Sequence, residues 1–426
     1  MKKLWYLIVF LMLFWTHPSS SIHAESTLQY LIDQAPEHSI VRIPRGVYHE
    51  SIVLSKPVTL QGNGQVTIQS CRKEPVISIK GQRVSVKNVT VIQCSQEKNA
   101  AAIQVSGTHH RIEHVHIRTK GIGIKLEHAY HTVITQSSIK GEKQHNGIDL
   151  WKSEQNVIEK VRIEKVRDGI YMEQSDYTTA VQNLIQQSNY GIHIMYSDHI
   201  TIQKNISKNN VAGAMVMETK GGKIENNEFI FNNRNVHAQG ILLFDATETK
   251  VVRNNISYNR VGIFAESASN NLILSNEVRG NFIGIQFKEA NGNIVSNNTF
   301  ISNVNEAQAL SSSDNEVKRN YWDASLKLDA DGSGYSDIPY KTNPFFLSLT
   351  KDIPEYQLFF HSPGMVVLQK LWKSPDNEAM TDDSPLMTAP IQDESKSSSG
   401  VIIVFSLLLF LGSITLWRIG RKKEDA

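Results

Sequence analysis

The sequence repeats itself with a period of about 22 residues over much of its length, a step within the range of known repeat proteins. Glycines, most of them followed by isoleucine, recur at this period with one longer step after Gly213: Gly147, Gly169, Gly191, Gly213, Gly240, Gly262 and Gly284. Asparagines run in phase with them at Asn205, Asn227, Asn254, Asn276, Asn298 and Asn320. Both series place five extra residues between Asn227 and Gly240. A fixed step of this size indicates a solenoid, in which each repeat buries its apolar face only against its neighbours.

Each repeat contains short stretches of alternating apolar and polar residues joined by Asn and Gly corners, which is typical of β-strands. We therefore predict an all-β fold, a right-handed parallel β-helix with 22-residue turns of three strands. The span from about Gly46 to Asn320 gives room for about twelve turns and a rod of about 60 Å. We expect the asparagines to be corner residues that adopt left-handed backbone and hydrogen-bond along the stack.

Composition excludes several classes of protein. Lys plus Arg total 44 against 42 Asp plus Glu, a formal charge of +2, which argues against a nucleic-acid-binding protein. Two cysteines cannot form a disulfide scaffold or a four-cysteine zinc site. Cys71 and Cys94 are separated by close to one turn, so both a disulfide and two unpaired core cysteines stay open.

The ends of the chain indicate export and anchoring. Residues 1–24 have the basic start, apolar run and small final residue of a secretory signal, with a retained N-terminal anchor as the alternative. Residues 401–417 form an uncharged apolar run that predicts a C-terminal transmembrane helix, followed by a cytoplasmic basic tail at 418–426. We thus expect a protein on the extracytoplasmic face of the cell membrane, held by a single span.

Three segments fill the space between the signal and the span. Residues 25–340 are assigned to the β-helix and a C-terminal cap that includes Tyr321, Trp322, Tyr335 and Tyr340. Residues 341–374 have apolar bursts typical of one or two short amphipathic helices, which predicts a docking segment at the membrane surface. Residues 375–400 are rich in Ser, Pro, Asp and Glu and are interpreted as a flexible tether.

Two consecutive turns carry an unusual outward face. Since Ile192 and Ile194 should point into the core, the alternation turns His193 and Met195 outward, and the next turn places Met215 and Met217 beside them. Thioether sulfur and imidazole nitrogen are ligands suited to Cu(I). The same four residues also suit a hydrophobic patch that docks another protein, and burial in the core is a third alternative.

An acidic loop follows the last turn. Asp329, Asp331, Ser333 and Asp337 stand at positions 1, 3, 5 and 9, a spacing that suits calcium, although no Glu closes the loop at position 12. The alternative is an Asp/Gly-rich turn that caps the solenoid.

Clustered carboxylates keep an enzyme in consideration, because many β-helix proteins act on acidic polysaccharides. The candidates are Asp149, Asp168, Glu173 and Asp176. Asp149 and Glu173 should lie near each other on neighbouring turns, but we expect no Arg or Lys in their column, and fold alone does not give an activity.

Three segments together resemble the NosD family, the maturation proteins of nitrous oxide reductase. They are Gly191-Ile-His-Ile-Met-Tyr-Ser-Asp with Ala212-Gly-Ala-Met-Val-Met, the stretch from Asn320-Tyr-Trp-Asp to Tyr340, and Pro354-Glu-Tyr-Gln-Leu-Phe-Phe-His-Ser-Pro-Gly-Met with the later Ser384-Pro-Leu-Met. The resemblance covers about residues 40 to 390, and the Gly-Ile and Asn repeats, common to many β-helices, add little to it.

The resemblance implies a non-catalytic role in copper-site assembly. NosD proteins work with an ABC transporter permease, its cytoplasmic ATPase and a copper chaperone lipoprotein to deliver copper to nitrous oxide reductase. The resemblance therefore implies transient copper binding at His193, Met195 and Met217. Met215 is added to these ligands because of its position beside them in this chain. The span at 401–417 departs from the family pattern, because many relatives are soluble. A polysaccharide lyase or hydrolase, and a structural adaptor without metal, are the alternative hypotheses.

Overall fold

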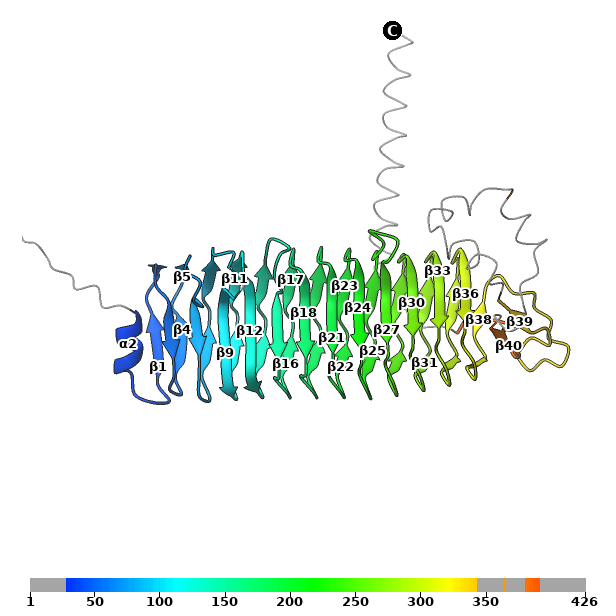
Figure 1. Cartoon of the computed structure of the whole chain (residues 1–426), viewed down its shortest axis with the longest axis horizontal. Helices are drawn as coiled ribbons and strands as arrows, with labels where there is room; N and C mark the ends of the chain where they lie inside the picture. Colours follow the sequence, from blue (N-terminus) through cyan, green and yellow to red (C-terminus); the bar gives the residue numbers. More distant parts are fainter. Residues whose placement is uncertain (1–27, 98, 343–363, 365–379, 391–426) are drawn as a thin grey trace, which may run out of the picture.

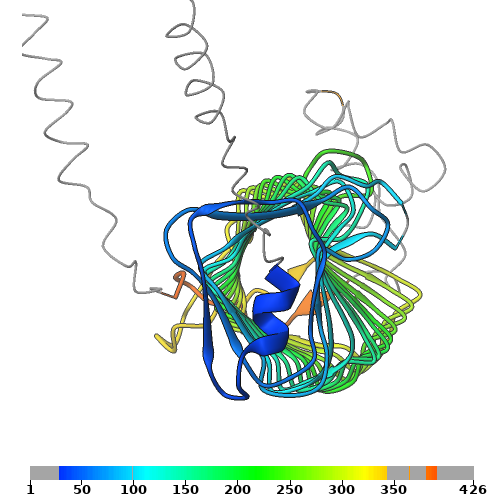
Figure 2. The same cartoon turned by 90° about the vertical axis from the view of Figure 1, so that its left-hand side faces the viewer.

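The protein is a right-handed parallel β-helix, seen in a computed structural model that describes residues 28–97, 99–342, 364 and 380–390. Within these residues, strands stack into three parallel sheets of 13, 13 and 12 strands that form the sides of one rod. Figure 1 shows the rod from the side, and Figure 2 shows the successive turns superimposed when it is seen from its N-terminal end.

Each sheet takes one strand from each turn. The first sheet contains β1 (Ile40–Ile43), β4 (Thr59–Gly62), β7 (Ser85–Lys87), β10 (Arg111–Glu113), β13 (Val133–Thr135), β16 (Val157–Glu159), β19 (Thr179–Val181), β22 (Thr201–Gln203), β25 (Lys223–Glu225), β28 (Lys250–Val252), β31 (Leu272–Leu274), β34 (Ile294–Ser296) and β37 (Glu316–Lys318). The second contains β2 (Gly46–Tyr48), β5 (Val66–Ser70), β8 (Thr90–Gln93), β11 (His116–Thr119), β14 (Ser138–Lys140), β17 (Arg162–Glu164), β20 (Leu184–Gln186), β23 (Ile206–Lys208), β26 (Glu228–Ile230), β29 (Asn255–Ser257), β32 (Glu277–Arg279), β35 (Thr299–Ile301) and β38 (Tyr321–Trp322). The third contains β3 (Ile52–Leu54), β6 (Ile77–Ile79), β9 (Ala101–Thr108), β12 (Ile122–Tyr130), β15 (Ile148–Trp151), β18 (Asp168–Glu173), β21 (Tyr190–Met195), β24 (Ala212–Met217), β27 (Gln239–Phe244), β30 (Val261–Glu266), β33 (Ile283–Lys288) and β36 (Asn305–Leu310).

The predicted all-β parallel β-helix is confirmed, with about thirteen turns where the sequence indicated about twelve. Alternate side chains of every sheet point inward and form one apolar core of mainly Ile and Val. The five extra residues fall in the connection between β26 and β27, at residues 231–238. The predicted helical segment 341–374 lies outside the described residues apart from 341, 342 and 364, and the predicted span 401–417 lies wholly outside them. In the described part of the chain, no helix is long and apolar enough to cross a membrane.

The repeated glycines are required by the close approach of neighbouring turns. A Cβ atom on Gly169 would lie 2.4 Å from the carbonyl oxygen of Gly191 and 2.4 Å from a methyl group of Ile185. Since carbon and oxygen atoms cannot approach to this distance, only glycine fits where the backbone enters the third sheet.

The repeated asparagines form a continuous hydrogen-bonded ladder inside the rod. Asn205 donates its backbone N–H and its side-chain amide to Oδ1 of Asn227, at 2.9 Å and 3.0 Å, and also donates to the carbonyl oxygen of Ala180. The expected left-handed backbone is wrong for these residues, because the positive φ belongs to the residue before each one, such as the exposed Lys204 with φ 55°. The preceding residue makes the bend, and the asparagine turns inward to satisfy buried peptide groups.

Both ends of the rod are covered. The short helix α2 (Leu28–Gln34) buries Leu28 and Ile32 over the N-terminal end, where Figure 2 shows it across the opening. At the other end Trp322 stacks between Phe300 and Tyr340, with ring centroids 4.3 Å and 4.6 Å away, as expected for a C-terminal cap.

The cap includes a strand that returns from far along the chain. β39 (Tyr340–Lys341) pairs antiparallel with β40 (Thr381–Asp382), inside the segment predicted as a tether. Asp382 Oδ2 accepts hydrogen bonds from the backbone N–H of Asn320, at 2.9 Å, and from the Trp322 indole, also at 2.9 Å. Thr342 and Met380 join the two sides with two hydrogen bonds of 2.9 Å. Asp382 thereby ends the asparagine ladder.

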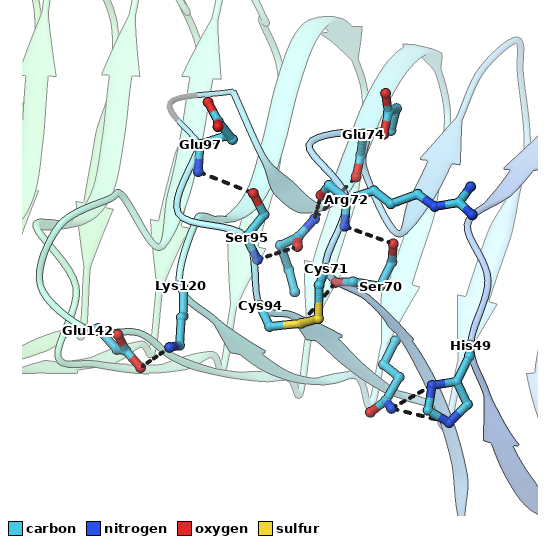
Figure 3. The surroundings of a disulfide bond; sticks show 12 residues. His49, Ser70, Cys71, Arg72, Glu74, Cys94, Ser95, Glu97, Lys120 and Glu142 are labelled. Atoms are coloured by element: carbon cyan, nitrogen blue, oxygen red, sulfur yellow. Dashed lines mark hydrogen bonds and ion pairs between the residues drawn. A yellow bond between two sulfur atoms is a disulfide. The ribbon is translucent and has the colours of Figure 1, made fainter.

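The two cysteines are bonded to each other in this structure. Cys71 and Cys94 lie on adjacent turns with their Cα atoms 4.6 Å apart, as Figure 3 shows. This decides between the two alternatives that the sequence left open.

Candidate metal-binding surface

Two neighbouring strands of the third sheet bring the four candidate ligands together. The register pairs His193 of β21 with Met215 of β24 and Met195 with Met217. The predicted side-by-side arrangement is therefore observed. Ile192 and Ile194 are buried in the core, so the four candidate side chains lie on the outer face. Adjacent strands in a sheet are about 4.8 Å apart, which lets donor atoms from both strands converge on one ion.

His193 is more enclosed than the alternation predicted. Its exposed fraction is 9%, where we expected a solvent-facing side chain. The reason is that the rings of Tyr171 on the previous strand and Tyr190 on the same strand both pack edge-on against the imidazole, with centroids 5.0 Å away. The imidazole therefore lies in a pocket of aromatic rings, whereas Met195, Met215 and Met217 are half-buried.

Asp168, at the start of β18, holds the imidazole from the previous turn. Its Oδ2 lies 3.1 Å from His193 Nδ1, and the residue is 3% exposed. A carboxylate only accepts hydrogen bonds, so Nδ1 carries a proton, and in the neutral form of the ring the lone pair lies on Nε2. Nε2 itself is buried and has no hydrogen-bond partner among the described residues, nor does Asp168 Oδ1.

Tyr171 links the histidine pocket to the methionines. Its hydroxyl donates to Glu173 Oε2 at 2.8 Å and lies 3.6 Å from Met195 Sδ. Burial, followed by the hydrogen bond and charge of Glu173, raises the pKa of Tyr171 well above its ordinary value. The phenol therefore stays protonated and holds Met195 against the edge of the pocket.

The arrangement offers sulfur and nitrogen donors rather than a cage of hard ligands. Within the described residues, no group of three or more His, Cys, Asp and Glu side chains is placed to hold a metal ion. A site here depends on thioethers together with the free Nε2 of His193, a donor set suited to Cu(I). From the sequence, Asp168 is only a candidate acid, and Tyr171 and Tyr190 have no predicted role. Spacing along the chain carried no information on their contact with the imidazole.

The carboxylate candidates lie in the same sheet, one and two turns toward the N-terminus. Asp149 is paired with Tyr171 and Trp151 with Glu173, so Asp149 and Glu173 are diagonal neighbours. The expectation that no Lys or Arg shares their column is wrong, because Lys125 is paired directly with Asp149.

Burial raises the pKa of Asp149, although the side-chain amide of Asn146 donates to its Oδ2 at 2.8 Å. Asp176 makes no hydrogen bond to the other candidate acids in the described part of the chain. Its Oδ1 accepts the backbone N–H of Asp198 on the next turn at 2.8 Å, a bond that stabilises the corner between strands.

In the acidic loop after the last turn, the carboxylates accept hydrogen bonds from backbone N–H groups of the same loop. Asp329 accepts N–H groups of Ser333 and Gly334 at 3.0 Å and 2.9 Å, and Asp331 accepts the same Ser333 N–H at 3.0 Å. Asp337 accepts from Ala330 at 2.8 Å. These bonds suit a capping turn, and calcium at Asp329, Asp331, Ser333 and Asp337 stays a prediction.

Comparison with solved structures shows the fold. The A-module of mannuronan C-5 epimerase AlgE6 from Azotobacter vinelandii superimposes with a TM-score of 0.57 at 14% identity, covering 66% of this chain and 89% of that one. The periplasmic alginate epimerase AlgG superimposes with a TM-score of 0.50 at 14% identity, covering 68% and 82%. Likeness at this level of identity concerns the β-helix alone.

Comparison of sequences identifies the family. No curated protein sequence matches the chain. The profile of the family described as "Periplasmic copper-binding protein (NosD)" matches residues 130–341, which include β18, β21 and β24 with all four candidate ligands. Over residues 130–341 the chain therefore matches the NosD family.

Proposed function

We propose that this chain is an exported, non-catalytic accessory protein that assists copper delivery to nitrous oxide reductase and assembly of its copper centres. Copper is its cargo, bound transiently as Cu(I) by His193, Met195, Met215 and Met217. The observation that carries the proposal is the unpartnered Nε2 of His193, whose ring is held by Asp168 through Nδ1 at a strand position paired with Met215 of the next strand. The family's description as periplasmic and copper-binding supports it.

The geometry suits transfer rather than storage. A protein that passes an ion on needs few and exchangeable ligands, and soft thioethers on an outer face meet that need. Asp168 contributes by fixing the ring and its tautomer, because a carboxylate behind a ligand histidine raises the basicity of the metal-binding nitrogen. An incoming ion can exchange through the half-buried Met195, Met215 and Met217 while His193 stays in place.

The proposed setting follows from the sequence. We place the β-helix on the extracytoplasmic face of the membrane, anchored by residues 401–417, with residues 341–374 docked onto the permease of an ABC transporter. Its cytoplasmic ATPase and a copper chaperone lipoprotein complete the proposed set of partners. The surface formed by His193, Met195, Met215 and Met217 then faces the donor chaperone and the acceptor reductase in turn.

The test is Cu(I) binding by the purified full-length protein under anaerobic conditions, in competition with a calibrated Cu(I) chelator. The variant carries His193→Asn, Met195→Leu, Met215→Leu and Met217→Leu, which keep side-chain size close to the original. The matched control carries His199→Asn, on the exposed corner of the same turn, and Met387→Leu in the cap. We expect tight binding by the wild type and the control and loss of binding in the quadruple variant. Binding that survives the four substitutions, or a wild type that binds no copper, contradicts the proposal.

A second candidate function, action on an acidic polysaccharide, is favoured by one observation. Lys125 is paired with Asp149, whose pKa is raised by burial, and a cation next to such a carboxyl suits proton transfer at a sugar acid. The test is turnover of a polyuronate by the wild type and by Asp149→Asn with Glu173→Gln. Turnover that is lost in the double variant supports the enzyme, and a wild type without turnover contradicts it.

A further inference from the structure

A basic groove lies on the rod at the edge where the second sheet leads into the third. It is a cavity of about 820 Å³, and its lining includes Arg118, Lys120, Lys140, Lys143 and Lys165, with Glu142 as the one acidic side chain among its described lining residues. None of these residues belongs to the proposed copper ligands or to the carboxylate candidates described above.

Unequal connections between strands create the groove. The connections from β8 to β9 and from β14 to β15 each have seven residues, 94–100 and 141–147, whereas the connection from β11 to β12 between them has two, 120–121. The described residues of the two long connections therefore form walls on either side of a low floor, with Cys94 lining one side and Gly141, Glu142 and Lys143 the other. These walls are two turns apart, about 9.6 Å between strand axes at the spacing of stacked strands. The disulfide to Cys71 fixes Cys94 at the base of the first wall, opposite Lys120 and Glu142 in Figure 3.

The charge in the groove is only partly neutralised. Lys120 lies 4.0 Å from Glu142, and Lys140 lies 3.5 Å from Glu164. Arg118, Lys143 and Lys165 are exposed and form no ion pair with any described residue. Since the whole chain has a formal charge of only +2, this concentration of positive charge is local to the groove.

The groove continues along the second sheet. A neighbouring cavity of about 250 Å³ shares Arg118 and Lys140 with it and adds His116, Arg162 and Glu164, which lies 3.2 Å from Arg162. A row of cations along connected hollows fits an elongated ligand with repeated negative charges better than a single small anion. Four of the five cations in the main cavity are lysines, which bind anionic groups as mobile point charges.

We propose that this groove binds an acidic glycan, a polysaccharide with carboxylate groups along its chain. Ile92 and Cys94 give part of the lining an apolar character that suits the face of a sugar ring, while the cations of the same lining meet its carboxylates. The choice of a glycan rests on the exported location proposed above, since acidic polymers outside the cytoplasm are mainly those of the cell envelope. The site would hold the rod against the envelope, independently of copper binding.

The experiment measures binding of an oligogalacturonate of defined length to the full-length protein in detergent, by calorimetry, at low salt and at ~0.5 M salt. The variant carries Arg118→Gln, Lys143→Gln and Lys165→Gln. The matched control removes the same charge from the first sheet and its corner through Lys204→Gln, Lys223→Gln and Lys250→Gln, three exposed lysines without an ion pair among the described residues. Neutral dextran tests the need for charge.

We expect binding that weakens with salt, falls by roughly tenfold or more in the groove variant and is unchanged in the control, with no binding of dextran. Equal loss in the control variant would show a general charge effect and overturn the groove. Absence of oligogalacturonate binding, or binding of polyphosphate or phosphatidylglycerol vesicles in its place, would overturn the acidic glycan. Copper binding by the same groove variant is measured in parallel, and its retention separates this proposal from the copper proposal.

Discussion

The carboxylate of Asp168 and the imidazole of His193 come from adjacent turns and meet at 3.1 Å, almost fully buried, with the second nitrogen of the ring left without a partner among the described residues. The pair is built by the parallel register of β18 and β21, which places Asp168 level with Tyr190 and Tyr171 level with His193. A histidine in this position is oriented before any ion arrives, which lowers the cost of ordering it on binding.

Asp168→Asn should weaken Cu(I) binding by about tenfold and Asp168→Ala by more, because the metal-binding nitrogen loses its negatively charged support. Chelator competition measures the affinity, and nitrogen NMR of the His193 ring checks whether the proton leaves Nδ1. Asp245→Asn, an exposed carboxylate further along the third sheet, is the control and should change neither. Unchanged affinity in both Asp168 variants would remove Asp168 from the site.

Asn254→Ala should destabilise the rod by about 3 kcal/mol. Asn254 Oδ1 accepts from the backbone and side-chain N–H groups of Asn227, and its amide donates to the carbonyl oxygen of Ile224, so the substitution leaves buried polar groups unpaired. Urea unfolding followed by circular dichroism gives the change. The half-exposed neighbour Asn255, replaced by Ala, serves as the comparison and should cost much less. Equal losses would mean that the ladder has no special role.

Gly169→Ala should cost about 2–3 kcal/mol, because the added methyl group meets the carbonyl oxygen of Gly191 at 2.4 Å and the turns must separate. Gly46→Ala is the matched substitution, since its Cβ would have contacts of 3.5 Å or more, all within ordinary range. Thermal unfolding of both variants tests the difference. A Gly169→Ala protein as stable as the wild type would show that the stacking distance is adjustable.

Glu306, buried beside the C-terminal cap, should make stability depend on pH. Burial and a hydrogen bond with Asp323 raise its pKa to about 9, from an ordinary value of 4.5. Between these values the unfolded chain releases the proton and the folded protein keeps it, so the free energy of unfolding falls as pH rises toward 9. This loss is absent below pH 4.5, where both states are protonated.

Glu306→Gln should therefore be more stable than the wild type at high pH and show a smaller fall over this window. Denaturant unfolding at a series of pH values measures it, with the exposed Glu228→Gln as control. If the wild type and Glu306→Gln follow parallel curves, Glu306 does not titrate in this way.

Most of the fold could be predicted from the periodicity of the sequence. The 22-residue step fixes which residues become neighbours on adjacent turns, so the pairing of His193 with Met215 followed from the sequence alone. The step failed where the period changes. Lys125 and Asp149 are separated by slightly more than one period, since the connection from β14 to β15 is long, so the regular step did not reveal their pairing.

Other features have no expression in the period. The enclosure of His193 depends on the bulk of Tyr171 and Tyr190, which the alternation of inward and outward residues does not weigh. The contact between Asp382 and Asn320 joins residues 62 positions apart, across a segment without repeats. Tertiary packing decides both.

The hydrogen bonds between Thr342 and Met380 have a mechanical consequence for the cap. They join residues 38 positions apart, so the chain is fixed to the cap at both residues. A load applied to the chain at either residue therefore passes into β39, β40 and the asparagine ladder. Exchange of residues 343–379 for a short linker should leave every turn of the rod in place.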